Sequence, residues 1–241
     1  MSRIILKLSG EALAGEMDGS MRNAKGAVKL YDEETIAGIA AQVKELCEAG
    51  HQVGVVTGGG NIWRGRTGDE IDRVKSDQIG MLATVMNCLY VSEIFRRAGL
   101  KTRVMTPFIC GTFTEQFSKD AAVRYLEEGI VVFFAGGTGH PYFSTDTGIV
   151  LRAVEVGADM ILMAKNVDGV YDSDPAKNPG AKRFDRLTYE EVVEKDLQAV
   201  DMTSSVLAKE NGMEMRVFAL QAPQSIIRAA SGDFDGTTIT A

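Results

Sequence analysis

Short runs of Val, Ile and Leu alternate with amphipathic segments along the chain, and this alternation limits the possible folds more than any other feature. The first two apolar runs are Ile4–Leu8 and Gln52–Thr57. Between them, Glu33–Ala49 carries apolar residues at helical spacing. Strands that alternate with helices form βαβ units, in which a mostly parallel sheet has helices on both faces. The sequence therefore predicts an α/β fold, a three-layer αβα sandwich around a central sheet.

The same alternation continues to the C-terminal end. The further predicted strands are Thr102–Thr106, Ile130–Ala135, Asp159–Ala164, Met215–Leu220 and Thr237–Thr240. The further predicted helices are Ile71–Ala98, Lys119–Glu128, Thr147–Val156, Thr188–Lys195, Met202–Asn211 and a short helix from Pro223. Long loops are expected at Gly10–Tyr31 and Lys165–Asp185. Because no repeat or proline-rich linker interrupts the pattern, we expect a single domain over residues 1–241.

Charge and cysteine content exclude several classes of protein. A net charge of −7 over 241 residues argues against broad binding to nucleic acid or anionic membranes, since both attract a basic surface. We see no uncharged apolar run of the ~20 residues that a membrane span needs, so we expect a cytoplasmic protein. Three scattered cysteines and two histidines make a Cys/His zinc site improbable and favour reduced thiols.

Polar or glycine-rich segments that could bind a ligand follow four of the predicted strands. Parallel sheets bind ligands at the carboxyl ends of their strands, so these loops are expected to converge. The four segments are Lys7 to Gly10, Gly58-Gly59-Gly60 with Arg64, Gly136 to Asp146, and Lys165 to Tyr171 followed by Asp174. Backbone amides without side chains beside an arginine suit an anion such as phosphate.

Each of these residues also has an ordinary structural explanation. The glycines can serve tight turns, Lys7 can extend to solvent, and Arg64 and Asp77 can be exposed surface charges. Asp146 can cap a helix. The chain lacks a P-loop, a G-x-G-x-x-G fingerprint and a G-x-S-x-G elbow. A phosphoryl-transfer enzyme of this kind would neutralise phosphate charge with separate lysines, backbone amides and magnesium.

Five segments together identify a family. In order they are ILKLSGEAL, VVTGGGNIWRG, DQIGMLATVMN, GGTGHPYFSTDT and VDGVYDSDP. They resemble the bacterial UMP kinases (uridylate kinases), a branch of the amino acid kinase family, and the resemblance extends from Ile4 to Gly236-Thr237. It implies a homohexamer that uses ATP and Mg²⁺ to phosphorylate UMP in pyrimidine nucleotide biosynthesis, with possible regulation by GTP or UTP.

The resemblance also implies roles for individual residues. The implied catalytic residues are Lys7, Asp146 and Asp201, and no metal-ligand set is assigned. The implied ATP-binding residues are Lys7, Leu8, Ser9, Gly10, Gly60, Arg64, Lys165, Asn166, Tyr171 and Asp174. The implied UMP-binding residues are Gly59, Arg64, Asp77, Thr138, Gly139, His140, Pro141, Tyr142, Phe143, Ser144 and Thr145. The part before about residue 160 would mainly bind UMP, and the part after it mainly ATP.

Three features depart from the family pattern. His140 stands where an asparagine is common, and Gly15–Leu30 is longer than expected in a region that borders the GTP site of some members. Lys165-Asn166 occupies positions that vary among members. Two other functions stay open at this point. One is a kinase of the same fold acting on a small carboxylate or carbamate, and the other is a non-catalytic nucleotide- or oxyanion-binding protein.

Overall fold

The computed structural model describes residues 1–14, 30–63, 71–197 and 200–241. Within this part, nine strands form one sheet in the order β4-β3-β5-β2-β1-β6-β10-β11-β9. All neighbouring pairs are parallel except β10 and β11. The strands are β1 (Arg3–Leu8), β2 (Gln52–Thr57), β3 (Thr102–Thr106), β4 (Glu115–Gln116), β5 (Val131–Phe134), β6 (Met160–Lys165), β9 (Arg186–Thr188), β10 (Glu214–Ala219) and β11 (Gly236–Thr240). The predicted mostly parallel sheet is confirmed.

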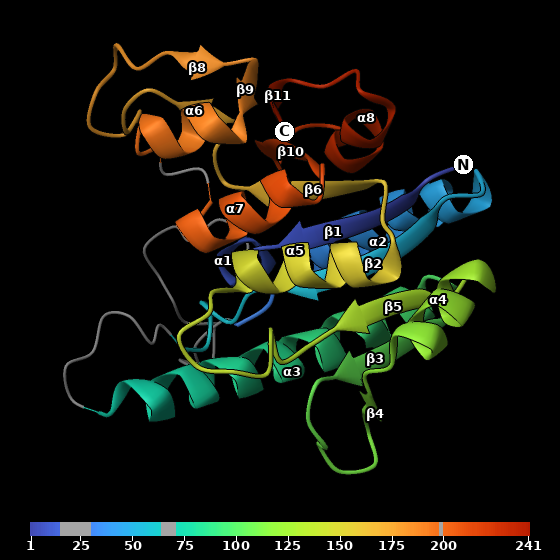
Figure 1. Cartoon of the computed structure of the whole chain (residues 1–241). Coiled ribbons are helices and arrows are strands. Elements are labelled where there is room, and N and C mark those ends of the chain that lie inside the picture. The colour runs from blue at the N-terminus through green and yellow to red at the C-terminus, as the bar shows by residue number, and fades with distance from the viewer. Residues whose placement is uncertain (15–29, 64–70, 198–199) are drawn as a thin grey trace, which may run out of the picture.

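Helices cover both faces of this sheet, as Figure 1 shows. They are α1 (Gly10–Leu13), α2 (Glu33–Glu48), α3 (Arg73–Arg97), α4 (Lys119–Glu127), α5 (Thr145–Val156), α6 (Tyr189–Glu194), α7 (Met202–Glu210) and α8 (Ser225–Ser231). One hydrophobic core joins the sheet to α2, α3 and α8, and a second joins it to α4, α5, α6 and α7. The three-layer αβα sandwich predicted from the sequence is therefore confirmed.

Strand β1 contributes side chains to both cores, and its alternation determines where Lys7 lies. Ile4, Leu6 and Leu8 are buried in the core with α2 and α3, whereas Ile5 is buried in the core with α5. Because side chains alternate along a strand, Lys7 lies on the same face as Ile5. This face is the one that α5 covers.

The structure differs from the prediction in its shortest elements. The predicted loop Gly10–Tyr31 begins with the four-residue helix α1, and the predicted loop Lys165–Asp185 contains a hairpin of β7 (Val170–Tyr171) and β8 (Arg183–Phe184). Strands β4 and β9 were also not predicted. Elements of two to four residues are too short to show a hydrophobic period. The short strands form here because neighbouring strands pair with them, and α1 begins where Ser9 caps it.

Helix α3 is long and apolar enough to cross a membrane by length and composition alone. Half of the apolar stretch is buried inside the protein, however, and Cys88, Val91 and Phe95 are fully buried in the core. This burial is typical of a core helix of a soluble protein. The three cysteines are free, and burial raises the pKa of both Cys47 and Cys88 to about 11.

Candidate active site

A lysine and an aspartate from distant parts of the chain meet at the carboxyl end of β1. The Lys7 ammonium forms an ion pair with Asp146, in the first turn of α5. The two side chains are only 13% and 17% exposed. A buried charge is costly unless it is paired, so each group supports the other. The structure thus brings together two of the three residues predicted to be catalytic.

A second lysine lies on the same face of the sheet. In β6, Ile161 and Met163 belong to the core under α5, and Lys165 follows them at the end of the strand with the same alternation. Burial lowers the pKa of Lys165; the Asp146 carboxylate opposes this shift and the Lys7 ammonium adds to it. The three charges therefore act on one another, and the site holds two cations around one carboxylate.

Asp201 links the N-terminal ends of two helices. It is the N-cap of α7, where its carboxylate accepts a hydrogen bond from the Ser204 amide at 2.9 Å. The same carboxylate accepts bonds from the hydroxyls of Ser144 and Thr147, at the start of α5. The Ser144 oxygen in turn accepts the amide of Asp146 at 3.0 Å. Asp201 therefore holds the turn that carries Asp146 and does not itself meet Lys7.

The triple glycine follows β2, and its three residues have different surroundings. Gly58 donates its N–H to the Leu8 carbonyl at 2.9 Å, so this amide is not available to phosphate, contrary to our expectation. A Cβ on Gly59 would lie 3.0 Å from both the Ala83 Cβ and the Gly80 carbonyl oxygen. A Cβ on Gly60 would meet only a Glu11 oxygen, at 3.9 Å. A Cβ on Gly58 would lie 3.0 Å from the Gly10 nitrogen, so packing explains the first two glycines, whereas the protein itself leaves room for a side chain at the third.

A cavity of about 210 Å³ opens beside this glycine turn. Eight of the predicted UMP-binding or ATP-binding residues line it, together with side chains from α3. The eight are Gly59, Gly60, Asp77, Thr138, His140, Phe143, Ser144 and Thr145. We call this the acceptor cavity. Gly60, predicted to face ATP, lies on its wall beside Gly59.

A second cavity, of about 410 Å³, has Lys165 in its wall. Its walls come from the β6–β7 loop, the hairpin and the segment before α7, and they include Lys165, Tyr171 and Asp174 among the predicted ATP-binding residues. We call this the donor cavity. Lys165 lines the donor cavity, while Asp146 directly follows two residues of the acceptor cavity, so the charged cluster lies between the two.

Hydrogen bonds hold the walls of both cavities. In the acceptor cavity, Asp77 accepts the Tyr142 amide at 2.8 Å and Arg73 at 2.9 Å. In the donor cavity, the Tyr171 hydroxyl donates to Asp168 at 2.6 Å, and Arg183 pairs with the same carboxylate at 2.8 Å. The bond from Tyr171 and then the charge of Arg183 keep the pKa of Asp168 below its usual range.

The remaining predicted residues lie close to the two cavities, except Arg64, which the structure does not describe. The Leu8 side chain is buried in the core, Ser9 caps α1 by accepting the Ala12 amide, and Gly10 packs against the glycine turn. Asn166 is exposed just beyond β6. Gly139 and Pro141 lie in the loop between β5 and α5, close to the acceptor cavity but not among its lining residues. Arg64 falls outside the described residues, so its predicted role stays a prediction.

Four residues whose side chains form hydrogen bonds at the acceptor cavity were not singled out from the sequence. Trp63, Ser76 and Thr84 line the acceptor cavity, and Asn87 lies behind it. The Trp63 indole donates to Ser76 at 3.0 Å, and Thr84 accepts the Gly136 amide at 2.8 Å. Ser76, Thr84 and Asn87 lie in or beside DQIGMLATVMN. The motif therefore indicated this part of the site, but it did not indicate which of its side chains face inward.

Comparison with known proteins identifies the family. The model of the amino acid kinase family matches residues 2–219. The chain belongs to the amino acid kinase family. This amino acid kinase is similar to the solved UMP kinase from Bacillus anthracis, with 34% identity, a TM-score of 0.90, and coverage of 99% of this chain and 96% of that chain.

Two further solved structures agree with this assignment. UMP kinase from Ureaplasma parvum is 32% identical, with a TM-score of 0.89 and coverage of 100% of this amino acid kinase and 99% of that chain. Uridylate kinase from Archaeoglobus fulgidus is 24% identical, with a TM-score of 0.71 and coverage of 99% and 100%, and shows the shared fold alone. The family predicted from the five sequence segments is confirmed.

Proposed function

We propose that this protein is a UMP kinase, which transfers the γ-phosphoryl group of ATP to UMP and produces UDP and ADP for pyrimidine nucleotide biosynthesis. The observation that carries this proposal is the position of the Lys7–Asp146–Lys165 cluster between two cavities at one sheet edge. Full-length similarity to two proteins described as UMP kinases supports the choice of acceptor.

The division of the chain also supports two nucleotide sites. Every residue that lines the acceptor cavity precedes residue 146, and every residue that lines the donor cavity follows residue 164. We propose that the part before about residue 160 mainly binds UMP and the part after it mainly binds ATP. The two nucleotides would then meet end to end at the lysines, which is the arrangement that in-line transfer requires.

Charge neutralisation provides the chemistry in this proposal. The acceptor oxygen belongs to a phosphate that is already an anion, so no general base has to remove a proton. The Lys7 ammonium and the amides of Gly59 and Gly60 would stabilise the charge on the transferring group and on the acceptor phosphate. Asp146 orients Lys7, and Asp201 in turn holds the turn that carries Asp146.

The described residues fit a magnesium ion that enters with ATP. They contain no group of three or more metal-ligating acids, histidines or cysteines. Magnesium commonly needs only one or two carboxylates when phosphate oxygens and water complete its coordination. Asp146 would be the carboxylate that holds the ion, which would neutralise charge on the ATP phosphates.

A panel of acceptors tests the proposed function. Purified protein with ATP and Mg²⁺ should form ADP in the presence of UMP and not in the presence of glutamate, aspartate or carbamate. ADP formation with one of the small acids and not with UMP would identify the rival kinase. Binding of both nucleotides without turnover would identify a non-catalytic binding protein. CMP and dUMP in the same panel would measure selectivity for the base and the sugar.

The glycine turn gives a prediction that separates ligand binding from folding. Gly60→Ala should fold with an unchanged Tm, because its Cβ would find open space. The methyl group would block a phosphate from the adjacent amide, so kcat/KM should fall about tenfold, equivalent to about 1.4 kcal/mol. The matched variant Gly59→Ala should lower the Tm, since its Cβ would press on Ala83 and Gly80. An unchanged kcat/KM for both substrates in Gly60→Ala would contradict the role of this amide.

Lys165 gives a prediction for pH dependence. Since burial lowers its pKa, Lys165 should lose its charge at a lower pH than an ordinary lysine does. As the pH rises through this range, kcat/KM for ATP should fall. Arginine stays protonated, so Lys165→Arg should move this decline to higher pH. The measurement is a pH profile of kcat/KM for ATP at saturating UMP, with the exposed Lys209→Arg as control. An alkaline limb that does not move in Lys165→Arg would remove Lys165 from ATP binding.

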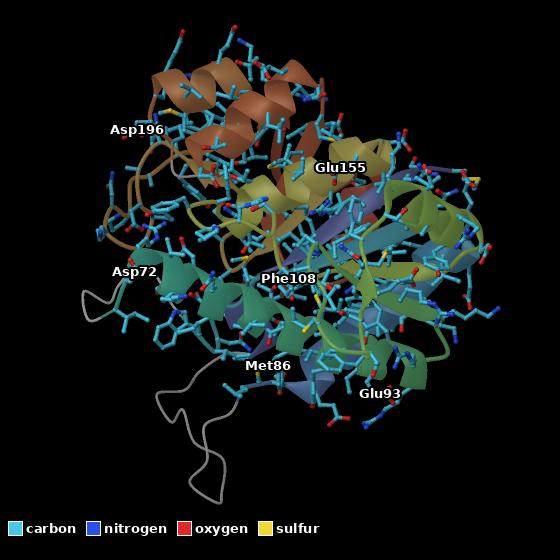
Figure 2. The ribbon with its side chains drawn as sticks, turned by 60° about the horizontal axis from the view of Figure 1, so that its bottom comes forward. Asp72, Met86, Glu93, Phe108, Glu155 and Asp196 are labelled. Atoms are coloured by element: carbon cyan, nitrogen blue, oxygen red, sulfur yellow. The ribbon has the colours of Figure 1, made fainter. Side chains whose placement is uncertain are left out.

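We further propose that the protein assembles into a homohexamer, with α3 providing one contact surface. Ile79, Leu82 and Met86 form an apolar stripe on this helix and are 39%, 51% and 51% exposed. Figure 2 shows Met86 on the outer side of α3, between Asp72 and Glu93. The double variant Leu82→Glu/Met86→Glu should reduce the assembly to smaller species in light scattering, whereas Leu82→Met should not. An unchanged molar mass would exclude this surface.

Regulation by GTP or UTP stays a prediction from the resemblance. Most of the long segment Gly15–Leu30 lies outside the described residues. Initial rates measured with and without each nucleotide, at several concentrations of UMP, would establish whether either one activates or inhibits the enzyme.

A further inference from the structure

A closed network of side-chain amides connects α3 to the glycine turn. Asn87 is fully buried on α3, and its Nδ2 donates to the Gly58 carbonyl at 2.7 Å and to Asn61 Oδ1 at 2.7 Å. Asn61 Nδ2 donates back to Asn87 Oδ1 at 3.2 Å. The two amides therefore bond to each other, and the second N–H of Asn87 is used on the backbone of the turn.

The chain that enters α2 completes this network. The second N–H of Asn61 donates to the Leu30 carbonyl at 3.0 Å, and the Tyr31 hydroxyl donates to Asn87 Oδ1 at 2.9 Å. Burial of the hydroxyl, together with the neighbouring Tyr90 and Cys88, raises the pKa of Tyr31 to about 12, so it keeps the proton that it donates. All four amide N–H bonds of Asn61 and Asn87 are thus used. Fully satisfied polar networks of this kind hold one conformation rigidly.

The hydrogen bond from Asn87 to the Gly58 carbonyl fixes the orientation of the Gly58–Gly59 peptide group. The described chain has no cis peptide, so the N–H of Gly59 points away from the Gly58 carbonyl that Asn87 holds. The Gly59 carbonyl in turn accepts the amides of Ile62 at 3.0 Å and Trp63 at 2.9 Å, which fixes the peptide that carries the Gly60 N–H. Among the described residues, neither Gly59 nor Gly60 has an acceptor for its N–H, and both glycines line the acceptor cavity.

We infer that Asn87 is a positioning residue for the phosphate in the acceptor cavity. Its side chain holds the Gly58 carbonyl and thereby keeps the Gly59 N–H directed at that phosphate. At a buried helix position that contacts only the core, an apolar residue would make the folded protein more stable than asparagine does, because a buried amide is unfavourable unless every donor is bonded. Thr84, one turn earlier on the same helix, accepts the amide of Gly136, which directly precedes the lining residue Gly137. This inference rests on the proposed function, since it takes the ligand to be a phosphate.

The test compares Asn87→Ala with Val91→Ala, because Val91 lies one turn along the same helix, is equally buried and belongs to the hydrophobic core. Both should lower the Tm. Only Asn87→Ala should raise KM for UMP, by about tenfold, the equivalent of one lost hydrogen bond of about 1.4 kcal/mol. KM for ATP should stay within about twofold of the wild-type value in both. If Asn87→Ala does not fold, the same measurements are made on Asn87→Ser, whose hydroxyl is too short to reach the Gly58 carbonyl.

A second readout does not depend on turnover. In protein labelled with ¹⁵N-glycine, the Gly59 amide resonance, assigned by its loss in Gly59→Ala, should shift when UMP or inorganic phosphate is added to the wild type and to Val91→Ala. It should not shift in Asn87→Ala. Equal KM values and equal shifts in the two variants would overturn the inference. If the Gly59 resonance shifts with phosphate in the wild type and in Val91→Ala but not in Asn87→Ala, and the wild type does not phosphorylate UMP, the proposed function is overturned while the role of Asn87 is supported.

Discussion

Lys7→Met is expected to lower kcat by about 10²–10³-fold and, because Asp146 loses its ion-pair partner, to lower the Tm, while the protein still folds and binds UMP. Methionine keeps most of the apolar stem at the end of β1 but removes the charge that pairs with Asp146. The lost cation would stabilise the transition state more than the bound substrates, so the loss should appear in kcat and less in KM for UMP. Steady-state kinetics and thermal unfolding of the purified variant give both quantities.

Arg3→Met is the matched control for this prediction. Arg3 is a cation on the same strand, and alternation places it on the same face as Lys7. It bonds to Gln52 at 2.7 Å and to the Val156 carbonyl, at the end of β1 away from the cavities. Its removal should lower the Tm and leave kcat nearly unchanged. Near-normal turnover in Lys7→Met, or an equal loss of kcat in Arg3→Met, would exclude Lys7 from the mechanism.

Gly10→Ala is expected to destabilise the protein by about 1–3 kcal/mol and to abolish most of its activity. An added Cβ would lie 2.6 Å from the Gly60 nitrogen and 2.7 Å from Asn61 Oδ1, and the first of these is backbone that cannot move aside cheaply. The loop after β1 would therefore push the glycine turn away from the acceptor cavity. Thermal unfolding and UMP titration measure the two effects.

Gly38→Ala should have the opposite effect on stability. Gly38 lies inside α2, and a Cβ there would meet nothing within 4 Å. Alanine in a helix interior is more favourable than glycine by roughly 0.5–1 kcal/mol, so the Tm should rise and the activity should not change. A Gly10→Ala protein with wild-type Tm and UMP affinity would show that the two loops do not pack as closely as the structure has them.

The sequence predicted the larger elements of the fold and the main loops of the site. The helix predicted at Ile71–Ala98 forms as α3, Arg73–Arg97, so the prediction is too long by two residues at the start and one at the end. The helix starts at Arg73 because the Asp72 carboxylate accepts the Lys75 amide at 3.1 Å. The short strands β4, β7, β8 and β9 could not be predicted, because two or three residues carry no period and depend on a partner strand.

Packing between elements determined the roles of the three glycines and of Asn87, which the local sequence left ambiguous. Three successive glycines look alike in a sequence, yet Gly58 gives its N–H to Leu8, Gly59 packs on α3 and Gly60 opens into space. Asn87 could equally have been an exposed polar residue of a helix. Its burial and its bond to Gly58 depend on how α3 packs against β2 and the glycine turn that follows it, which no local pattern contains.

The order of strands and helices, the family, and the four loops that bear polar chemistry follow from residues that lie close together in the chain, because period and motif are local properties. The tertiary structure alone decided that Lys7, Asp146 and Lys165 form one charged cluster, and that a cavity opens on either side of it. These residues are up to 158 positions apart (165 − 7). Their proximity arises from the parallel register of β1 and β6 and from the start of α5, which are non-local contacts.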